Sequence, residues 1–135
     1  MKFTEVTVST SRPGPEEWFT GETWMEELGT LPTPTPTRIL RVTFSPGART
    51  AWHTHPLGQV LHILDGVARI GREGEPVREA HPGDSVEILP NERHWHGAGP
   101  GHLMTHLAVY AFDPEVGADA VWEEHVSDES YGATD

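Results

Sequence analysis

The sequence contains no cysteine among its 135 residues. This absence excludes a disulfide framework, a thiolate metal site and a cysteine nucleophile. It also fits a reducing compartment, so we expect a cytoplasmic location.

Positive charge is scarce as well. Lys and Arg number 9 against 21 Asp and Glu, which gives a formal net charge of −12. A chain this acidic repels nucleic acid and anionic membranes. No apolar run approaches the ~18 residues of a membrane span, and the first residues lack the apolar centre of a signal peptide. Neither nucleic acid nor a membrane is therefore expected as a partner.

Glycine and proline, by contrast, are abundant, with 14 and 12 copies. They separate short runs in which apolar and polar residues alternate with a period near two, as in β-strands. The expected strands lie at residues 39–44, 48–53, 59–64, 67–72, 85–89, 94–97 and 104–112. No helical periodicity separates these runs, so the sequence predicts an all-β sandwich or barrel.

The chain length suits a single domain. We expect the barrel core at residues 38–113, an N-terminal arm at 1–37 that packs on it, and a C-terminal arm at 114–135. The prolines within residues 31–36 predict an extended stretch that wraps the barrel. Asp65-Gly66 predicts a hairpin turn between two neighbouring strands.

Histidine is the unusual residue, with nine copies. His53 and His55 are two apart in an expected strand, so their side chains face the same side. Gln59 follows after a short turn, and His94 adds a fourth donor from a later hairpin. Three imidazoles and one oxygen donor suit divalent Mn, Fe, Co, Ni or Zn. If Gln59 only supports the ligands, a three-histidine site with open positions remains.

These residues occur in a pattern that resembles the cupin superfamily. The first cupin motif consists of Gly, five residues, His-x-His, three or four residues, Glu, six residues and Gly. Residues 47–66 match every spacing of this motif but carry Gln59 in place of Glu. In the second motif Gly83 and His94 keep their separation. Its proline is displaced to Pro90, its glycine is replaced by Asn91, and its later Asn by Ala98. Asn tolerates the left-handed conformation that a turn at position 91 needs. The resemblance implies a jelly-roll β-barrel.

A more specific resemblance covers nearly the whole chain. Residues 17–21, 46–59, 94–98 and 104–108 look like the small bacterial cupins that include manganese-dependent hydroxynitrile lyases. That family implies Mn(II) bound by the three histidines and the glutamine. It also implies that another histidine of the barrel acts as acid and base.

Two further histidines are candidates for that catalytic role. His106 alternates with Tyr110 along the last expected strand, and His96 lies two residues after His94. A neutral imidazole near a divalent ion has a depressed pKa and stays a proton acceptor. We favour His106 as the base and His96 as the next candidate; for each, the alternative is a hydrogen-bonded structural histidine. The expected substrate pocket is lined by Leu40, Val42, Met104 and Tyr110.

The remaining histidines, at positions 62, 81, 102 and 125, carry no such signal and are expected to be structural or solvated. Trp52 and Trp95 each neighbour an expected ligand, so by alternation they face away from the pocket. Together with Trp18, Trp24 and Trp122, they predict an aromatic exterior that a partner covers. We therefore expect a homodimer or homotetramer.

Three functions are compatible with these features. The leading hypothesis is a metal-dependent hydroxynitrile lyase that reversibly cleaves a small cyanohydrin substrate to a carbonyl compound and cyanide. The second is an Fe(II) or Ni(II) dioxygenase, ranked lower because a neutral Gln ligand leaves the metal electron-poor and harder to oxidise. The third is a cupin that binds a small ligand without catalysis.

Overall fold

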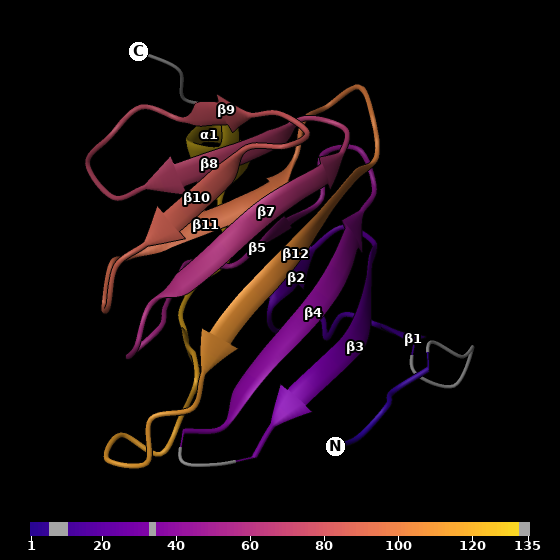
Figure 1. Ribbon diagram of the computed structural model, residues 1–135. Helices are drawn as coiled ribbons and strands as arrows, with labels where there is room; N and C mark the ends of the chain where they lie inside the picture. Colours follow the sequence, from indigo (N-terminus) through magenta and orange to yellow (C-terminus); the bar gives the residue numbers. More distant parts are fainter. Residues whose placement is uncertain (6–10, 33–34, 133–135) are drawn as a thin grey trace.

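In the computed structural model, residues 1–5, 11–32 and 35–132 are described, and they form two curled antiparallel sheets that face each other (Figure 1). The first sheet has the strand order β1 (Ser11–Pro13), β3 (Thr23–Leu31), β4 (Thr37–Phe44), β12 (Met104–Ala111), β7 (Gln59–Asp65) and β10 (Ser85–Ile88). The second sheet contains β13 (Val121–Trp122), β6 (His53–Thr54), β11 (His94–Ala98), β5 (Arg49–Thr50) and β2 (Phe19–Thr20), with β8 (Ala68–Arg72) and β9 (Arg78–Ala80) continuing beside β11. One short helix, α1 (Asp128–Gly132), ends the described chain. The all-β barrel expected from the sequence is confirmed.

The alternating runs of the sequence appear as strands close to their expected bounds. The exception is the run at 48–53, which is divided into β5 and β6. Between them the amide of Ala51 donates to the carbonyl of Trp18, and the amide of Trp52 donates to the carbonyl of Glu124. Because these two amides donate to other segments and not to a neighbouring strand of the sheet, the run bends at this point.

The turn at Asp65-Gly66 is not a hairpin, and that prediction is wrong. β7 pairs with β10 and β12 in the first sheet, whereas β8 pairs with β9 and β11 in the second. The turn is a corner between the sheets. Gly66 has φ 77°, and a Cβ there would collide with the carbonyl oxygen of Leu103. Asn91, in contrast, has the positive φ expected for it, 62°.

Both terminal segments contribute strands to the sheets. Within the range 1–37, β3 pairs with β4 from Thr23↔Phe44 to Leu31↔Thr37, so this part contributes a strand to the first sheet. Of the proline-rich stretch, Thr33 and Pro34 lie outside the described residues, whereas Leu31 at the end of β3 and Thr37 at the start of β4 are register partners. Within the range 114–135, β13 pairs with β6.

The core lies between the two sheets and is apolar except at one end. Inward-facing residues alternate along β4, β7 and β12 and include Leu40, Phe44, Leu61, Ile63 and Met104, each at most 1% exposed. The same inward face of β12 carries His106, which is 0% exposed. The barrel therefore buries a polar group where its apolar packing ends.

The tryptophans do not form the aromatic exterior that the sequence predicted. Trp95 is fully buried beneath Tyr131 of α1, with ring centroids 5.6 Å apart. Trp18 and Trp122 are half-buried and stack on each other at 5.0 Å. Trp24 alone among the five is exposed, at 53%. No helix among the described residues is long and apolar enough to span a membrane.

Candidate metal centre

The four expected ligands converge at one end of the barrel interior. His53 lies on β6, His55 follows that strand, Gln59 begins β7 and His94 begins β11. His53 and His94 are direct register partners, and their ring centroids are 4.2 Å apart. The ring of His55 lies 4.9 Å from that of His53 and 5.6 Å from that of His94. All four side chains are buried, between 1% and 6% exposed.

Backbone carbonyls hold the Nδ1 atoms of these three histidines. His53 donates to Ala51 at 2.9 Å, His55 to Asp119 at 2.7 Å and His94 to Glu92 at 2.8 Å. A neutral imidazole has one N–H, so a carbonyl at Nδ1 leaves a lone pair at Nε2. Metal-ligating histidines commonly have this support, because the second hydrogen bond fixes both tautomer and ring orientation.

The contact between His94 and Gln59 provides a test of whether a cation fits here. Nε2 of His94 lies 3.4 Å from Oε1 of Gln59. Because the proton of His94 is held at Nδ1, its Nε2 and the Oε1 of Gln59 face each other with a lone pair each. In addition, Nε2 of His55 is buried and has no hydrogen-bond partner among the described residues. A cation bound by these atoms would satisfy all of them at once, so the donor set fits a divalent metal ion.

Burial keeps these imidazoles neutral. Desolvation lowers the pKa of His53 well below its usual range, and the neighbouring imidazoles of His94 and His55 lower it further. Desolvation likewise lowers the pKa of His94 to about 4 and that of His55 below its usual value. At neutral pH the three rings are therefore unprotonated at Nε2 and available as ligands.

His96 and His106 form a second pair beside the ligands. Nε2 of His106 lies 2.9 Å from Nδ1 of His96, and both side chains are buried. Desolvation lowers the pKa of His106 to about 4 and lowers that of His96 as well. In the part of the chain that the structure describes, Nε2 of His96 and Nδ1 of His106 have no hydrogen-bond partner. One imidazole of the pair therefore donates a hydrogen bond to the other inside the barrel.

His96 is the member of this pair that faces the ligands. Nitrogen atoms of His53, His94 and His96 all lie within 4.8 Å of one another, so three histidines are positioned to bind a metal. The ring of His96 is 5.3 Å from that of His53, which is close to the spacing of His55. By the proximity of their nitrogen atoms, His96 and not His55 completes this group of three. The hydrogen bond from Nδ1 of His55 to a backbone carbonyl favours His55 as the third ligand, because Nδ1 of His96 is bonded to another histidine instead.

The cavity beside the histidines has a mostly apolar lining and contains three of the four expected pocket residues. Leu40, Val42 and Tyr110 line it, together with His53, His55, Gln59, His96 and His106. Met104 is not part of the lining, although the sequence placed it there. It is 0% exposed and opposes Phe44 at the start of β12, where the strand runs through the packed core.

Several residues of this cavity were missed by the sequence analysis. Trp122 stacks on His53, with centroids 4.4 Å apart, and Trp18 stacks on Trp122. Arg38 forms an ion pair with Asp119 at 3.1 Å and donates a hydrogen bond of 2.9 Å to the hydroxyl of Tyr110. Trp122 and Asp119 belong to a segment far along the chain, and no local spacing indicates that it returns to the site.

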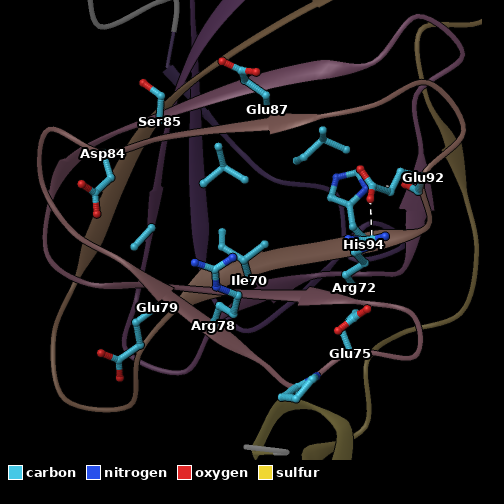
Figure 2. A pocket seen from close by; sticks show the side chains of 14 residues that line it. Ile70, Arg72, Glu75, Arg78, Glu79, Asp84, Ser85, Glu87, Glu92 and His94 are labelled. Carbon is cyan, nitrogen blue, oxygen red and sulfur yellow. Dashed lines mark hydrogen bonds and ion pairs between the residues drawn. The ribbon is translucent and has the colours of Figure 1, made fainter.

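A larger cleft of about 560 Å³ opens on the other side of His94 (Figure 2). Its rim is charged, with Arg72 and Glu92 beside His94 and Arg78 and Glu79 farther away. Of the expected site residues, only His94 lines it. The chemistry of the histidine cluster therefore belongs to the smaller, mostly apolar cavity.

Comparison with known proteins agrees with this arrangement. The family model described as "Cupin domain" matches residues 40–109, which is more than half of the chain. The chain belongs to the cupin family. This cupin is 48% identical over 132 residues to an (R)-mandelonitrile lyase of Granulicella tundricola, covering 97% of the chain and 98% of that protein. The relative is a named lyase, which supports an enzymatic role for this cupin.

Solved structures share the fold of this cupin. A cupin-like protein of Thermotoga maritima matches with a TM-score of 0.81 and 37% identity, over 91% of this chain and 92% of that one. A polyketide cyclase of Streptomyces resistomycificus matches with a TM-score of 0.73 and 19% identity, over 96% and 91% of the two chains. At that identity the second likeness concerns the fold alone.

Proposed function

We propose that this cupin is a metal-dependent hydroxynitrile lyase, which reversibly cleaves a cyanohydrin to an aldehyde or ketone and cyanide. The observation that carries the proposal is the set of buried, neutral imidazoles of His53, His55 and His94 beside the hydrogen-bonded pair of His96 and His106. The likeness to the mandelonitrile lyase supports the choice of reaction. Cleavage must move one proton from the substrate hydroxyl and one electron pair onto the departing cyanide.

His53, His55, Gln59 and His94 would hold the metal, and Mn(II) is the ion that we propose. All four donors are uncharged, so the site keeps the full charge of the cation. Bound there, a divalent ion would supply a Lewis acid that stabilises negative charge on the substrate oxygen. The carbonyls of Ala51, Asp119 and Glu92 keep the three imidazoles in the ligand tautomer.

His96 and His106 would move the proton. When Nδ1 of His96 donates to Nε2 of His106, Nε2 of His96 keeps a lone pair and serves as the base for the substrate hydroxyl. We therefore propose that His106 lies behind the base and acts through His96, whereas the sequence favoured His106 as the base itself. The burial that lowers both pKa values keeps the pair unprotonated, and therefore ready to accept a proton, at neutral pH.

The remaining walls position the substrate. Leu40 and Val42 provide apolar contacts for its carbon skeleton, and Trp18 and Trp122 restrict access of water to His53. Arg38 donates to the oxygen of Tyr110, so the hydroxyl proton of Tyr110 is free to donate to a polar substituent of the substrate. We therefore expect a small cyanohydrin with one apolar side.

The proposal is tested by following mandelonitrile cleavage and oxygen uptake with the same metal-loaded protein. Cleavage without oxygen consumption, equal under air and under argon, is the expected result. Oxygen-dependent turnover of a substrate such as a catechol, without cyanohydrin cleavage, would instead favour the Fe(II) or Ni(II) dioxygenase. Binding of small ligands with neither activity would favour a non-catalytic cupin.

A further inference from the structure

The C-terminal segment, residues 119–132, reaches back to the histidine cluster at two points. The carbonyl of Asp119 accepts the 2.7 Å hydrogen bond from Nδ1 of His55. Trp122 pairs with His53 across β13 and β6, and its ring stacks on that imidazole at an interplanar angle of 27°. Two of the proposed ligands therefore depend on this segment for their surroundings.

The segment itself has little buried surface to hold it in place. Between residues 121 and 129, only Val126 is buried, at 2% exposure. Its strand β13 has two residues. After it, the backbone of Trp52 exchanges two hydrogen bonds with residues 123 and 124, and the side chain of Arg93 donates to the carboxylates of both. The far end of the segment, residues 125–132, follows these bonds and has Val126 as its one buried residue, so its position depends on other contacts.

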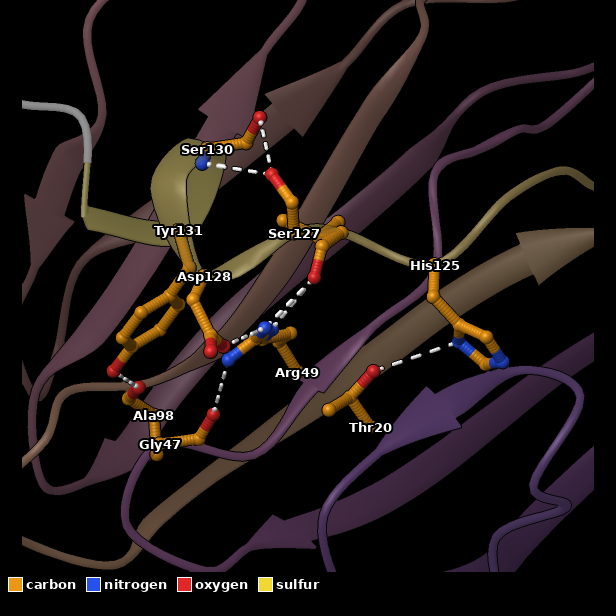
Figure 3. Close-up of polar contacts among 10 residues, drawn as sticks. Thr20, Gly47, Arg49, Ala98, His125, Ser127, Asp128, Ser130 and Tyr131 are labelled. Carbon is orange, nitrogen blue, oxygen red and sulfur yellow. Dashed lines mark hydrogen bonds and ion pairs between the residues drawn. The ribbon is translucent and has the colours of Figure 1, made fainter.

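Arg49 fixes that far end from within the first histidine motif (Figure 3). It is buried, at 6% exposure, and its guanidinium donates to the carbonyl of Val126 at 2.7 and 3.2 Å and to the carboxylate of Asp128 at 2.8 Å. Arg49 lies on β5, four residues before His53. One side chain therefore joins the ligand-bearing run to the C-terminal segment.

Tyr131 provides the second anchor. Its hydroxyl donates to the carbonyl of Ala98 at 2.6 Å (Figure 3). The guanidinium carbons of Arg49 and Arg69 lie 4.7 and 5.0 Å from its ring centroid, within the range of a cation–π contact. Nη2 of Arg69 also donates to the carbonyl of Tyr131 at 2.9 Å. The ring is held by two cations and by Trp95 beneath it.

We infer that Arg49 and Tyr131 are positioning residues for the metal centre, which they support by holding the C-terminal segment against His53 and His55. This inference rests on the proposed metal site. With the anchor in place, the Asp119 carbonyl keeps the proton of His55 at Nδ1 and the lone pair at Nε2. When the anchor is lost, the carbonyl moves away, and His55 populates the other tautomer and other ring orientations.

The test compares Tyr131→Ala and Tyr131→Phe with the control Arg41→Gln. Arg41 pairs with Glu26 at 2.7 Å on the first sheet, so the control removes a comparable surface contact away from the segment. Metal release is followed after addition of excess chelator, and the His55 tautomer is read from ¹⁵N NMR of the metal-free protein. Melting temperatures are recorded for all three variants.

Loss of a supporting contact of this kind typically weakens metal binding about 10–100-fold, so Tyr131→Ala is expected to release metal on the order of 10-fold faster. Tyr131→Phe keeps the ring, loses one hydrogen bond and is expected to lie between the wild type and Tyr131→Ala. His55 is expected to show mixed tautomers in Tyr131→Ala and a single Nδ1-protonated form in Arg41→Gln.

Wild-type release rates together with an unchanged His55 tautomer in both Tyr131 variants would overturn the inference. The inference would also be overturned if the rate of metal release only tracked the melting temperature of each variant, so that Arg41→Gln and Tyr131→Ala released metal alike. If the wild type binds no metal, the proposed function fails, but the tautomer of His55 still decides the positioning role. If Tyr131→Ala does not fold, the same comparison is made with Tyr131→Phe.

Discussion

At the scale of single residues, the kind of hydrogen-bond partner divides the five buried imidazoles into two sets. His53, His55 and His94 donate to backbone carbonyls, which cannot accept or release a proton. His96 and His106 are bonded to each other, so a proton can move along their hydrogen bond. The first set is suited to hold a cation, and the second is suited to acid–base chemistry.

Removal of a ligand imidazole is expected to remove the metal. His53→Ala and His94→Ala should each lose most of the expected one divalent ion per chain, because three donors and a water bind less tightly than four donors. Elemental analysis of purified variants measures this. His62→Ala is the matched control, since His62 lies on β7 and its Nδ1 contacts the hydroxyl of Ser85, outside the cluster. Equal metal in all three variants would contradict the ligand assignment.

Removal of the proton-transferring pair is expected to separate catalysis from metal binding. His96→Ala should retain the ion while cyanohydrin cleavage falls about 10²–10⁴-fold, the usual contribution of a general base. His106→Ala should also retain the ion, with a smaller loss of rate, because His106 acts through His96. Metal content, melting temperature and initial rate are measured together. Loss of stability with full activity of the folded fraction would mean that these histidines are structural.

The buried histidines also predict how stability depends on pH in the metal-free protein. Their pKa values are lowered in the fold, to about 4 for His94 and His106, whereas in the unfolded chain they titrate near 6.5. Between these values the unfolded state binds more protons, so the free energy of unfolding falls as pH decreases. The expected slope is about 1.4 kcal/mol per pH unit for each such histidine. Urea unfolding between pH 7 and pH 4.5 checks it; a flat profile would contradict neutral burial.

At the scale of strands and turns, alternation along the sequence predicted most strands because one face of each is buried. It failed at the turn 65–66, where Asp-Gly suits a tight hairpin and equally suits a corner between sheets. Alternation also could not detect the bend at Ala51 and Trp52, because the bonds that cause it come from Trp18 and Glu124. Local patterns fix the faces of strands, and long-range contacts decide how the strands are joined.

The corner at Gly66 provides a test of this interpretation. Gly66→Ala should destabilise the protein by more than about 1 kcal/mol, the approximate cost of forcing a non-glycine residue to a positive φ. The loss of stability beyond this cost arises from the collision of the added Cβ with the carbonyl oxygen of Leu103. Gly74→Ala is the matched control, since Gly74 has φ 79° and nothing within 4 Å of an added Cβ. Equal losses in urea unfolding would contradict the close approach.

At the scale of the whole molecule, the site is formed where the C-terminal segment packs against the strands that carry the histidines. The spacing of His53, His55, Gln59 and His94 identified the proposed ligands, because a motif fixes residues that are near in sequence. Asp119 and Trp122 could not be found in this way, since they come from a segment that the sequence predicted only as a C-terminal arm. Trp122 was expected in an aromatic exterior, and the structure places its ring on His53.

Self-association remains a prediction, and of the five tryptophans only Trp24 is still exposed to support it. The outer face of the first sheet exposes Trp24, Val60 and Leu64, at 53%, 42% and 42%. Exposed apolar side chains that lie together on one face of a sheet are commonly covered by a partner. We expect a homodimer or homotetramer, and Trp24→Glu with Leu64→Glu should shift it toward the monomer. Light scattering measures the mass; a monomeric wild type at micromolar concentration would contradict this expectation.

The central claim is that cyanohydrin cleavage needs a divalent ion held by the histidine cluster. The most direct measurement is the rate of mandelonitrile cleavage by one preparation before chelation, after chelation, and after addition of Mn(II) in known proportion to the chain. We predict that activity disappears with the metal and returns in proportion to Mn(II), reaching a plateau at about one ion per chain. Undiminished cleavage by the fully metal-depleted, folded protein would contradict the account.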